Sequence, residues 1–172
     1  MLGQVSIKTY MTGIDFTGVL RTKDVSPYIY FIKRGYLLYI GETQKNPVIR
    51  WSEHLGEKGS FRNAANRVDE EIIVGNFKTF FFAYECNLLE TDLAEVERRR
   101  ATQHIEHEVH SLIMCNGLPE RGIRLISNTI RTAPLGYNYE WLSSYVKDIY
   151  QLFVNDLISV MVLEPLVPDS RE

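Results

Sequence analysis

The stretch YIYFIKRGYLLYIGE, residues 28–42, holds two short strand-like runs separated by Arg34-Gly35. Tyr, Ile and Phe favour the pleated, half-buried surface of a sheet, and glycine is a common residue of tight turns. The stretch therefore predicts a hairpin with strands over residues 28–33 and 36–41. Two tyrosines in adjacent strands and a closing glycine are more than a plain hairpin needs, so the same stretch is also the first candidate for a functional site.

The segments that follow the hairpin predict helices and one further strand. KNPVIRWSEHLGEKG, residues 45–59, predicts a helix because Asn46 is a natural N-cap and Pro47 suits the first helical position. FRNAANRV, residues 61–68, indicates a second short helix. FKTFFFAYE, residues 77–85, is rich in aromatic residues and predicts a central strand.

The rest of the chain extends this pattern at both ends. Residues 1–26 alternate apolar and polar positions, which indicates an N-terminal strand or hairpin. A long helix is predicted from about Leu88 to Cys115, with a stop at Asn116-Gly117. IRLISN, residues 123–128, predicts a short final strand. Residues 139–163 carry apolar side chains at helical spacing and predict a C-terminal amphipathic helix.

These elements predict the α+β class: a small central antiparallel sheet flanked by helices, with an N-terminal extension and a C-terminal amphipathic helix. The chain has 172 residues, of which 45% are apolar, enough for one domain with its own core. We expect a single domain over residues 1–172, with its core at about 27–130 and the C-terminal helix at about 139–163.

Composition narrows the environment and the partners. No stretch is long and apolar enough to cross a bilayer, and no signal pattern begins the chain, so we expect a cytoplasmic protein without a membrane partner. The formal net charge of −3 does not indicate a nucleic-acid-binding protein, so such binding requires a local basic patch. Cys86 and Cys115 lie in apolar surroundings and predict buried free thiols.

Four polar side chains and one glycine converge in this pattern. Tyr30 and Tyr39 reach one face of the sheet if the two strands pair through the turn. Arg50 and His54 are four positions apart, so they lie on one side of the helix that follows. Gly41 has no Cβ and therefore leaves room for a backbone or a phosphate to approach.

These residues, in this order, resemble the GIY-YIG nuclease family over roughly residues 28–113. The resemblance rests on Tyr28-Ile29-Tyr30, on Tyr39-Ile40-Gly41 and on Arg50-Trp51-Ser52-Glu53-His54, followed by a glutamate on a later helix. The spacing of Arg50 and His54 is most similar to the restriction-endonuclease branch. In the first motif, Tyr28 stands where the family has glycine. Asn128 would correspond to the terminal asparagine of the family.

The resemblance implies a DNA endonuclease that hydrolyses phosphodiester bonds with one Mg²⁺ or Mn²⁺ and cuts at a specific sequence, as type II restriction enzymes do. A tyrosine phenolate would be the general base, with Tyr30 favoured over Tyr39. Arg50 would stabilise charge on the phosphate, because its planar guanidinium pairs with two oxygens and stays protonated. His54 would orient the phenol or bind the phosphate.

The metal ligand implied by the resemblance is a glutamate of the long helix, and two residues compete for the role. Glu106 follows Ile105 and precedes Val109 by three positions, which is closer to the family arrangement than the surroundings of Glu108. We therefore favour Glu106, with Glu108 as the second candidate. A carboxylate is a hard oxygen ligand and suits Mg²⁺.

Three alternatives remain open at this level. A nuclease of this kind could select branched or damaged DNA instead of a sequence, or act on single-stranded DNA or RNA. The chain could also be a catalytically silent nucleic-acid-binding module that keeps the fold. A homodimer would explain cutting of both strands of a palindromic duplex, since its two-fold axis matches that of the target.

Overall fold

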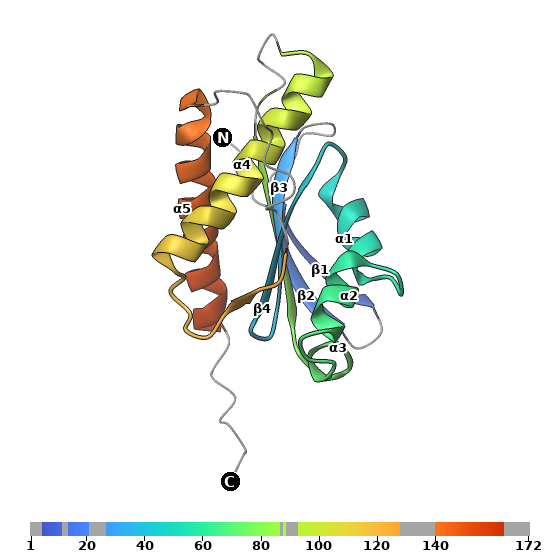
Figure 1. The fold of residues 1–172 in the computed structure, drawn as a ribbon. Helices are drawn as coiled ribbons and strands as arrows, with labels where there is room; N and C mark the ends of the chain where they lie inside the picture. The colour runs from blue at the N-terminus through green and yellow to red at the C-terminus, as the bar shows by residue number, and fades with distance from the viewer. Residues whose placement is uncertain are drawn as a thin grey trace.

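A computed structural model describes residues 5–11, 14–20, 27–86, 88, 93–127 and 140–163 of the protein, and side chains from residue 27 to residue 161 within these ranges. Six strands form one sheet in the order β1-β2-β5-β3-β4-β6. Helices α1, α2 and α3 lie on one side of the sheet, and α4 and α5 lie on the other (Figure 1). The predicted α+β class, with helices flanking a sheet, is confirmed.

The centre of the sheet is the predicted hairpin with one further strand. β3 (Tyr28–Arg34) and β4 (Leu37–Thr43) pair antiparallel, joined by a turn in which Gly35 has a φ of 53°. This left-handed conformation favours glycine. β5 (Thr79–Glu85) pairs antiparallel with the other edge of β3, as the aromatic run over residues 77–85 predicts.

The outer strands make the whole sheet mixed. β1 (Val5–Met11) and β2 (Ile14–Leu20) form an antiparallel hairpin, and β2 then pairs parallel with β5. On the opposite edge, β6 (Arg124–Leu125) pairs parallel with β4. The predicted small central antiparallel sheet is therefore present as β5, β3 and β4, and the parallel pairings of β2 with β5 and of β4 with β6 make the whole sheet mixed. The final strand, predicted over residues 123–128, is two residues long and pairs with Leu37 and Leu38 at the start of β4.

The helices on one side begin with α1 (Pro47–Leu55), which matches its prediction closely. The Asn46 side chain accepts a hydrogen bond from the Val48 N–H at 2.9 Å, so the predicted N-cap is present. α2 (Ser60–Asn66) is the predicted second helix. A four-residue helix, α3 (Glu71–Val74), precedes β5 and was not predicted.

The long helix α4 (Glu95–Asn116) begins later than predicted. Leu88, the predicted start, is fully buried in the core ahead of the helix. The first turn begins where the Glu97 carboxylate accepts a hydrogen bond from the Ala94 N–H at 3.1 Å. The predicted stop is confirmed, because Gly117 ends the helix with a φ of 75°.

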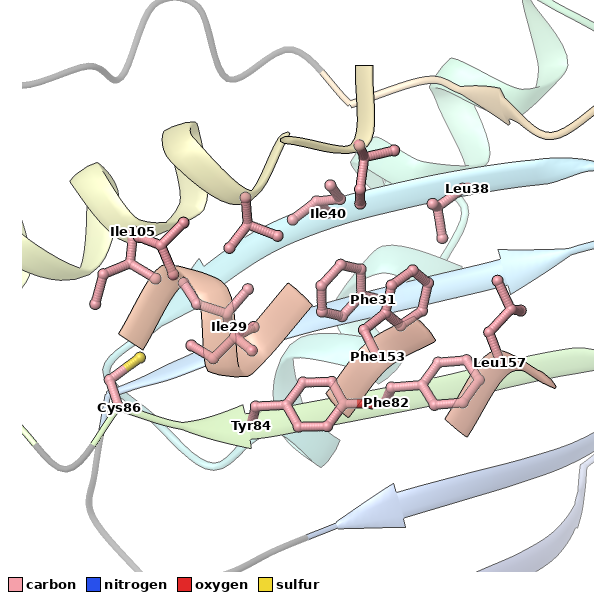
Figure 2. Close-up of a cluster of buried hydrophobic side chains, with 14 of the residues drawn as sticks. Ile29, Phe31, Leu38, Ile40, Phe82, Tyr84, Cys86, Ile105, Phe153 and Leu157 are labelled. Carbon is pink, nitrogen blue, oxygen red and sulfur yellow. The ribbon is translucent and has the colours of Figure 1, made fainter. Parts of the chain in front are cut away.

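The largest apolar core lies between the sheet, α4 and α5 (Ser143–Leu163), which follows a short 3-10 turn, η2 (Glu140–Leu142). The Phe31 and Phe153 rings stack there, with centroids 3.9 Å apart and planes 3° from parallel. Figure 2 shows these two rings among aliphatic side chains from the strands and both helices. The predicted C-terminal amphipathic helix is therefore present as α5, and its apolar side packs against this core.

The two cysteines differ in exposure. Cys86 is buried in this core, where burial raises the pKa of its thiol, whereas Cys115 is exposed near the end of α4. Both are free thiols, so the prediction of a buried thiol is wrong for Cys115, which lies on the outer side of the last turn. Among the described helices, none is both long and apolar enough to traverse a bilayer.

Candidate active site

The two tyrosines of the hairpin meet at one histidine. Tyr30 on β3 and Tyr39 on β4 lie on the same face of the sheet, because Tyr30 pairs with Gly41 and Ile32 pairs with Tyr39. Their ring centroids lie 5.4 and 4.8 Å from that of His54, which α1 presents to this face. The structure thus brings the two tyrosines and the histidine of the predicted site together.

Both ring nitrogens of His54 have a hydrogen-bond partner. The Tyr30 hydroxyl lies 2.5 Å from Nε2, and the Ser60 hydroxyl lies 2.7 Å from Nδ1. His54 itself is only 1% exposed. Ser60 is a residue of the site that the sequence did not single out. Its position six residues after His54 gives no helical or strand signal, since a turn lies between them.

Gly41, in the second tyrosine motif, makes room for Tyr30 of the first motif. A Cβ built on Gly41 would overlap the Tyr30 hydroxyl, so the absence of a side chain is what allows the phenol to lie across β4. The expectation that Gly41 leaves room for a phosphate is therefore wrong in this structure. The space beside Gly41 holds the Tyr30 ring.

Arg50 lies on the exposed side of α1, with its side chain 46% exposed. Its guanidinium donates a hydrogen bond to the Glu53 carboxylate at 2.6 Å, one helical turn further on. The positive charge of Arg50 lowers the pKa of both Tyr30 and His54. Arg50 thus acts on the same two groups that the sequence grouped with it, and it bonds to Glu53 as well.

Burial dominates the protonation of these groups. It raises the pKa of Tyr30 well above its usual range, a rise that Tyr39 reinforces and Arg50 opposes only in part. Burial also raises the pKa of Tyr39. It lowers the pKa of His54 to about 4, and Arg50 adds to that change. Near neutral pH, the protein alone therefore holds two phenols and an uncharged imidazole at this site.

Glu106 enters the site from α4 and is 7% exposed. Burial raises its pKa to about 8, and the negative charge of Glu42 adds to the rise. Its charge in turn raises the pKa of Tyr30 and of Tyr39. Glu108 is different: its side chain is 44% exposed and lies 4.0 Å from the imidazole of His107. The charge of Glu106 acts on the tyrosines, and the choice of Glu106 over Glu108 as metal ligand stays a prediction.

The chemistry of Glu106 and Glu42 fits a hard divalent cation. Two neighbouring carboxylates, one of them buried, repel each other, and within the described residues no cation offsets the rise in the pKa of Glu106. Oxygen ligands of this kind suit Mg²⁺, which keeps several waters when it binds protein. Among the described residues, no group of three or more His, Cys, Asp or Glu side chains forms a complete metal cage.

A pocket of about 590 Å³ opens beside this group of residues. It lies between the end of β4, α1 and the first turn of α4. Charged side chains of both signs line it: Glu42, Lys45, Arg50, Glu53, Glu95 and Arg99. Arg50 and Glu42 line both the pocket and the site. An extended polymer bound in the pocket would therefore also reach the site.

Residues 26–103 match the family model described as the GIY-YIG catalytic domain. The matched range includes both tyrosine motifs, Arg50 and His54, and it ends before Glu106. No curated protein and no solved structure matches the chain. The resemblance is thus confirmed for the catalytic domain, which implies nuclease activity and a nucleic-acid substrate. The restriction-endonuclease branch stays a prediction, and Asn128 lies outside the described residues.

Proposed function

We propose that this protein is a divalent-metal-dependent endonuclease that hydrolyses DNA phosphodiester bonds at a specific sequence. One observation carries the proposal: two tyrosines and a neutral histidine meet on one face of the sheet, and the charge of a buried glutamate from α4 acts on both tyrosines. Burying such polar groups costs free energy unless they are paired, so a purely structural hairpin would not be expected to collect them. The GIY-YIG match over the same strands supports a nuclease reading of that face.

Glu106, with Glu42 beside it, is the residue that we propose to hold Mg²⁺ or Mn²⁺. A metal bound there polarises the phosphate and stabilises charge on the leaving oxygen. Glu106 must be ionised to act as a ligand. Because its pKa is raised, binding of the cation would release a proton from the carboxyl group near neutral pH. Glu42 would then share in holding the ion, through its own oxygen or a water.

Tyr30 is the proposed general base, which takes a proton from the attacking water. Its oxygen lies against His54 and near the charges of Arg50 and Glu106. In the protein alone it is a phenol, because burial keeps its pKa high. The phenolate of Tyr30 therefore needs added positive charge nearby. A metal ion held by Glu106 and Glu42 would supply that charge.

Arg50 is the proposed partner of the phosphate. In the free protein it is bound to Glu53, but both side chains are about half exposed. An exposed ion pair of this kind contributes only about 0–1 kcal/mol. A phosphate can therefore displace Glu53 at little cost, and the guanidinium can then bind two phosphate oxygens. Lys45 and Arg99 line the adjoining pocket, where we place the nucleotides next to the cut.

We also propose that the chain works as one domain and pairs with a second copy on duplex DNA. Each chain carries one set of these residues, so cutting both strands calls for two copies. A two-fold axis shared with a palindromic target would place one site on each strand.

The test is cleavage by the purified protein of phage and plasmid DNA, single-stranded DNA, branched DNA and RNA, with Mg²⁺ or with EDTA. The Arg50→Ala and Glu106→Ala variants should cut roughly a thousandfold more slowly, while both remain folded. Arg121→Ala, which removes an exposed arginine outside the site, is the charge-matched control. Discrete duplex fragments support a recognition sequence. A smear, cleavage of other substrates only, or binding without cleavage would replace this proposal with one of its three alternatives.

A further inference from the structure

Ser60 joins the two tyrosines into one hydrogen-bonded chain. The Tyr39 hydroxyl donates to the Ser60 oxygen at 3.5 Å, and that oxygen lies 2.7 Å from Nδ1 of His54. On the other side of the ring, Nε2 lies 2.5 Å from the Tyr30 hydroxyl. The path from Tyr39 to Tyr30 thus runs through Ser60 and His54 without a break.

The turn between α1 and α2 places Ser60 at this position. The Gly59 N–H donates to the Gly56 carbonyl at 2.8 Å and closes the turn. A Cβ on Gly59 would overlap the His54 backbone carbonyl, so only glycine lets the chain pass so close to the end of α1. Ser60 follows directly as the first residue of α2 and turns its hydroxyl to the imidazole.

The donors and acceptors of the chain fix its direction. With Tyr39 as donor to the Ser60 oxygen, the Ser60 hydroxyl hydrogen can be directed at Nδ1 of His54. An uncharged imidazole has one N–H, so in this arrangement its hydrogen is on Nε2. That N–H would point at the Tyr30 oxygen, to which the Arg50 guanidinium also hydrogen-bonds, so Tyr30 would be the acceptor at the end of the chain.

We propose that Ser60 is a positioning residue that holds His54 as its Nε2–H tautomer and so makes Tyr30, and not Tyr39, the accepting end of the chain. This inference rests on the proposed function and deepens it by choosing between the two tyrosines. A hydrogen bond donated to an oxygen favours its charged form. Donors in series also polarise one another. Tyr30 is therefore the phenol suited to be a base, and Tyr39 is left as a donor.

The direct test is nitrogen NMR of the uniformly ¹⁵N-labelled protein near neutral pH, without substrate. The chain has four histidines, and the signals that disappear in His54→Gln identify those of His54. Two-bond couplings between ring protons and nitrogens then distinguish the two neutral tautomers. We expect Nε2–H in the wild type, a shift toward Nδ1–H in Ser60→Ala, and retention of Nε2–H in Ser60→Thr, which keeps a hydroxyl.

Ser52→Ala is the matched control, because the Ser52 hydroxyl bonds to the Ile49 carbonyl on the exposed side of α1. It should leave the His54 signals unchanged. An Nδ1–H tautomer in the wild type, or the same His54 signals in Ser60→Ala as in the wild type, would overturn the inference. Since Ser60 is an exposed helix position, alanine there should not disturb folding.

Cleavage kinetics give a second readout. Losing one hydrogen bond in the chain should lower kcat by about tenfold in Ser60→Ala, with KM unchanged, and Ser60→Thr should restore it. An unchanged kcat in Ser60→Ala contradicts the inference. The NMR result needs no substrate, so the two proposals can fail separately: the expected tautomers without any cleavage would reject the nuclease and keep the role of Ser60.

Discussion

The two faces of the central sheet are built from the same strands but hold different chemistry. Phe31 points toward α4 and α5 and stacks on Phe153 at 3.9 Å. Tyr30, its neighbour in β3, points the other way and lies 2.5 Å from a nitrogen of His54. One face is an apolar core, whereas the other combines a second apolar cluster, which includes Trp51, with buried polar groups around His54. The difference shows how the alternation of a strand lets one segment provide both stability and a reactive site.

Helix α4 contributes both to the apolar core and to the electrostatics of the site. Ile105 is fully buried in that core, whereas the charge of Glu106, the next residue, raises the pKa of both tyrosines. The core that α4 and α5 form with the sheet therefore also fixes the position of the proposed metal ligand. The packing of α4 in this core therefore offsets the free-energy cost of burying the Glu106 carboxylate.

Two arginines on the polar side of the molecule make a second contrast. Arg34 donates to the carbonyls of four residues and to the Thr79 hydroxyl, which together tie the chain between α3 and β5 to the end of β3; the carbonyls belong to Ile72, Ile73, Gly75 and Phe77. All of its donor nitrogens are engaged, so it is structural. Arg50 is half exposed and bonds to the exposed Glu53 carboxylate and to the Tyr30 hydroxyl, so it is the arginine that can turn to a phosphate.

A large effect on the polar face, after those of Arg50→Ala and Glu106→Ala, is expected for Gly41→Ala. The added Cβ would overlap the Tyr30 hydroxyl and force the phenol away from His54. We expect cleavage to slow by about a hundredfold or more, measured as single-turnover rates. Gly56→Ala is the control, because a Cβ there meets its nearest atom at an ordinary 3.5 Å. Normal cleavage by Gly41→Ala would show that the position of Tyr30 does not matter.

The matching change on the apolar face is Phe153→Ala. It removes the ring stacked on Phe31 and should lower the free energy of unfolding by about 3–5 kcal/mol, measured by urea titration. The cleavage rate per folded molecule should stay close to that of the wild type. Ile158→Ala, at a position that is 44% exposed, should change stability little. A large loss of cleavage rate per folded Phe153→Ala molecule would show that the apolar face also determines activity.

The pH dependence of stability should report on Glu106. Its pKa is raised in the folded protein to about 8 from an ordinary value of 4.5, so the protonated form favours folding. That stability is fully present below the unfolded pKa and is lost as the pH rises through the folded pKa. As the pH rises from about 5 to about 8, the melting temperature of the wild type should therefore fall relative to that of Glu106→Gln.

Mg²⁺ sharpens the same experiment. At the upper end of that range, added Mg²⁺ should raise the melting temperature of the wild type, since a ligand that binds only the folded state stabilises it. The Glu106→Gln variant should respond much less. A constant difference between the two proteins at all pH values, or an equal response to Mg²⁺, would argue against a buried carboxylate that binds the ion.

The smallest expected effect concerns the two thiols. Cys115 is exposed and should react quickly with a thiol reagent, whereas Cys86 is buried with a raised pKa and should react only when the apolar core opens. Counting the modified thiols with time, by mass spectrometry, should give one fast and one slow site. Faster modification of Cys86 in Phe153→Ala would tie its protection to that core. Equal rates for both thiols in the wild type would contradict the packing described.

Local signals in the sequence were enough for the hairpin and α1. The turn at Gly35 and the Asn46 cap depend on neighbours in the chain, and both were predicted. The start of α4 was not, because Leu88 has helix-forming neighbours but is drawn into the core by tertiary packing.

The site was predictable only where its residues follow one another at regular spacing. Tyr30, Tyr39 and His54 come together as their strands and helix imply. Ser60 could not be found that way, since its place beside His54 depends on the turn at Gly59. The influence of Glu42 on Glu106 is likewise a product of α4 crossing near the end of β4.

The most direct test of the account is single-turnover cleavage of duplex DNA by the wild type and by Glu106→Gln, each with Mg²⁺ and with EDTA. Glutamine keeps the size of the side chain and removes its charge. We expect cleavage by the wild type with Mg²⁺ and none in the other three reactions. Equal cleavage by Glu106→Gln, or cleavage in EDTA, would contradict a metal-dependent site on the polar face of the sheet.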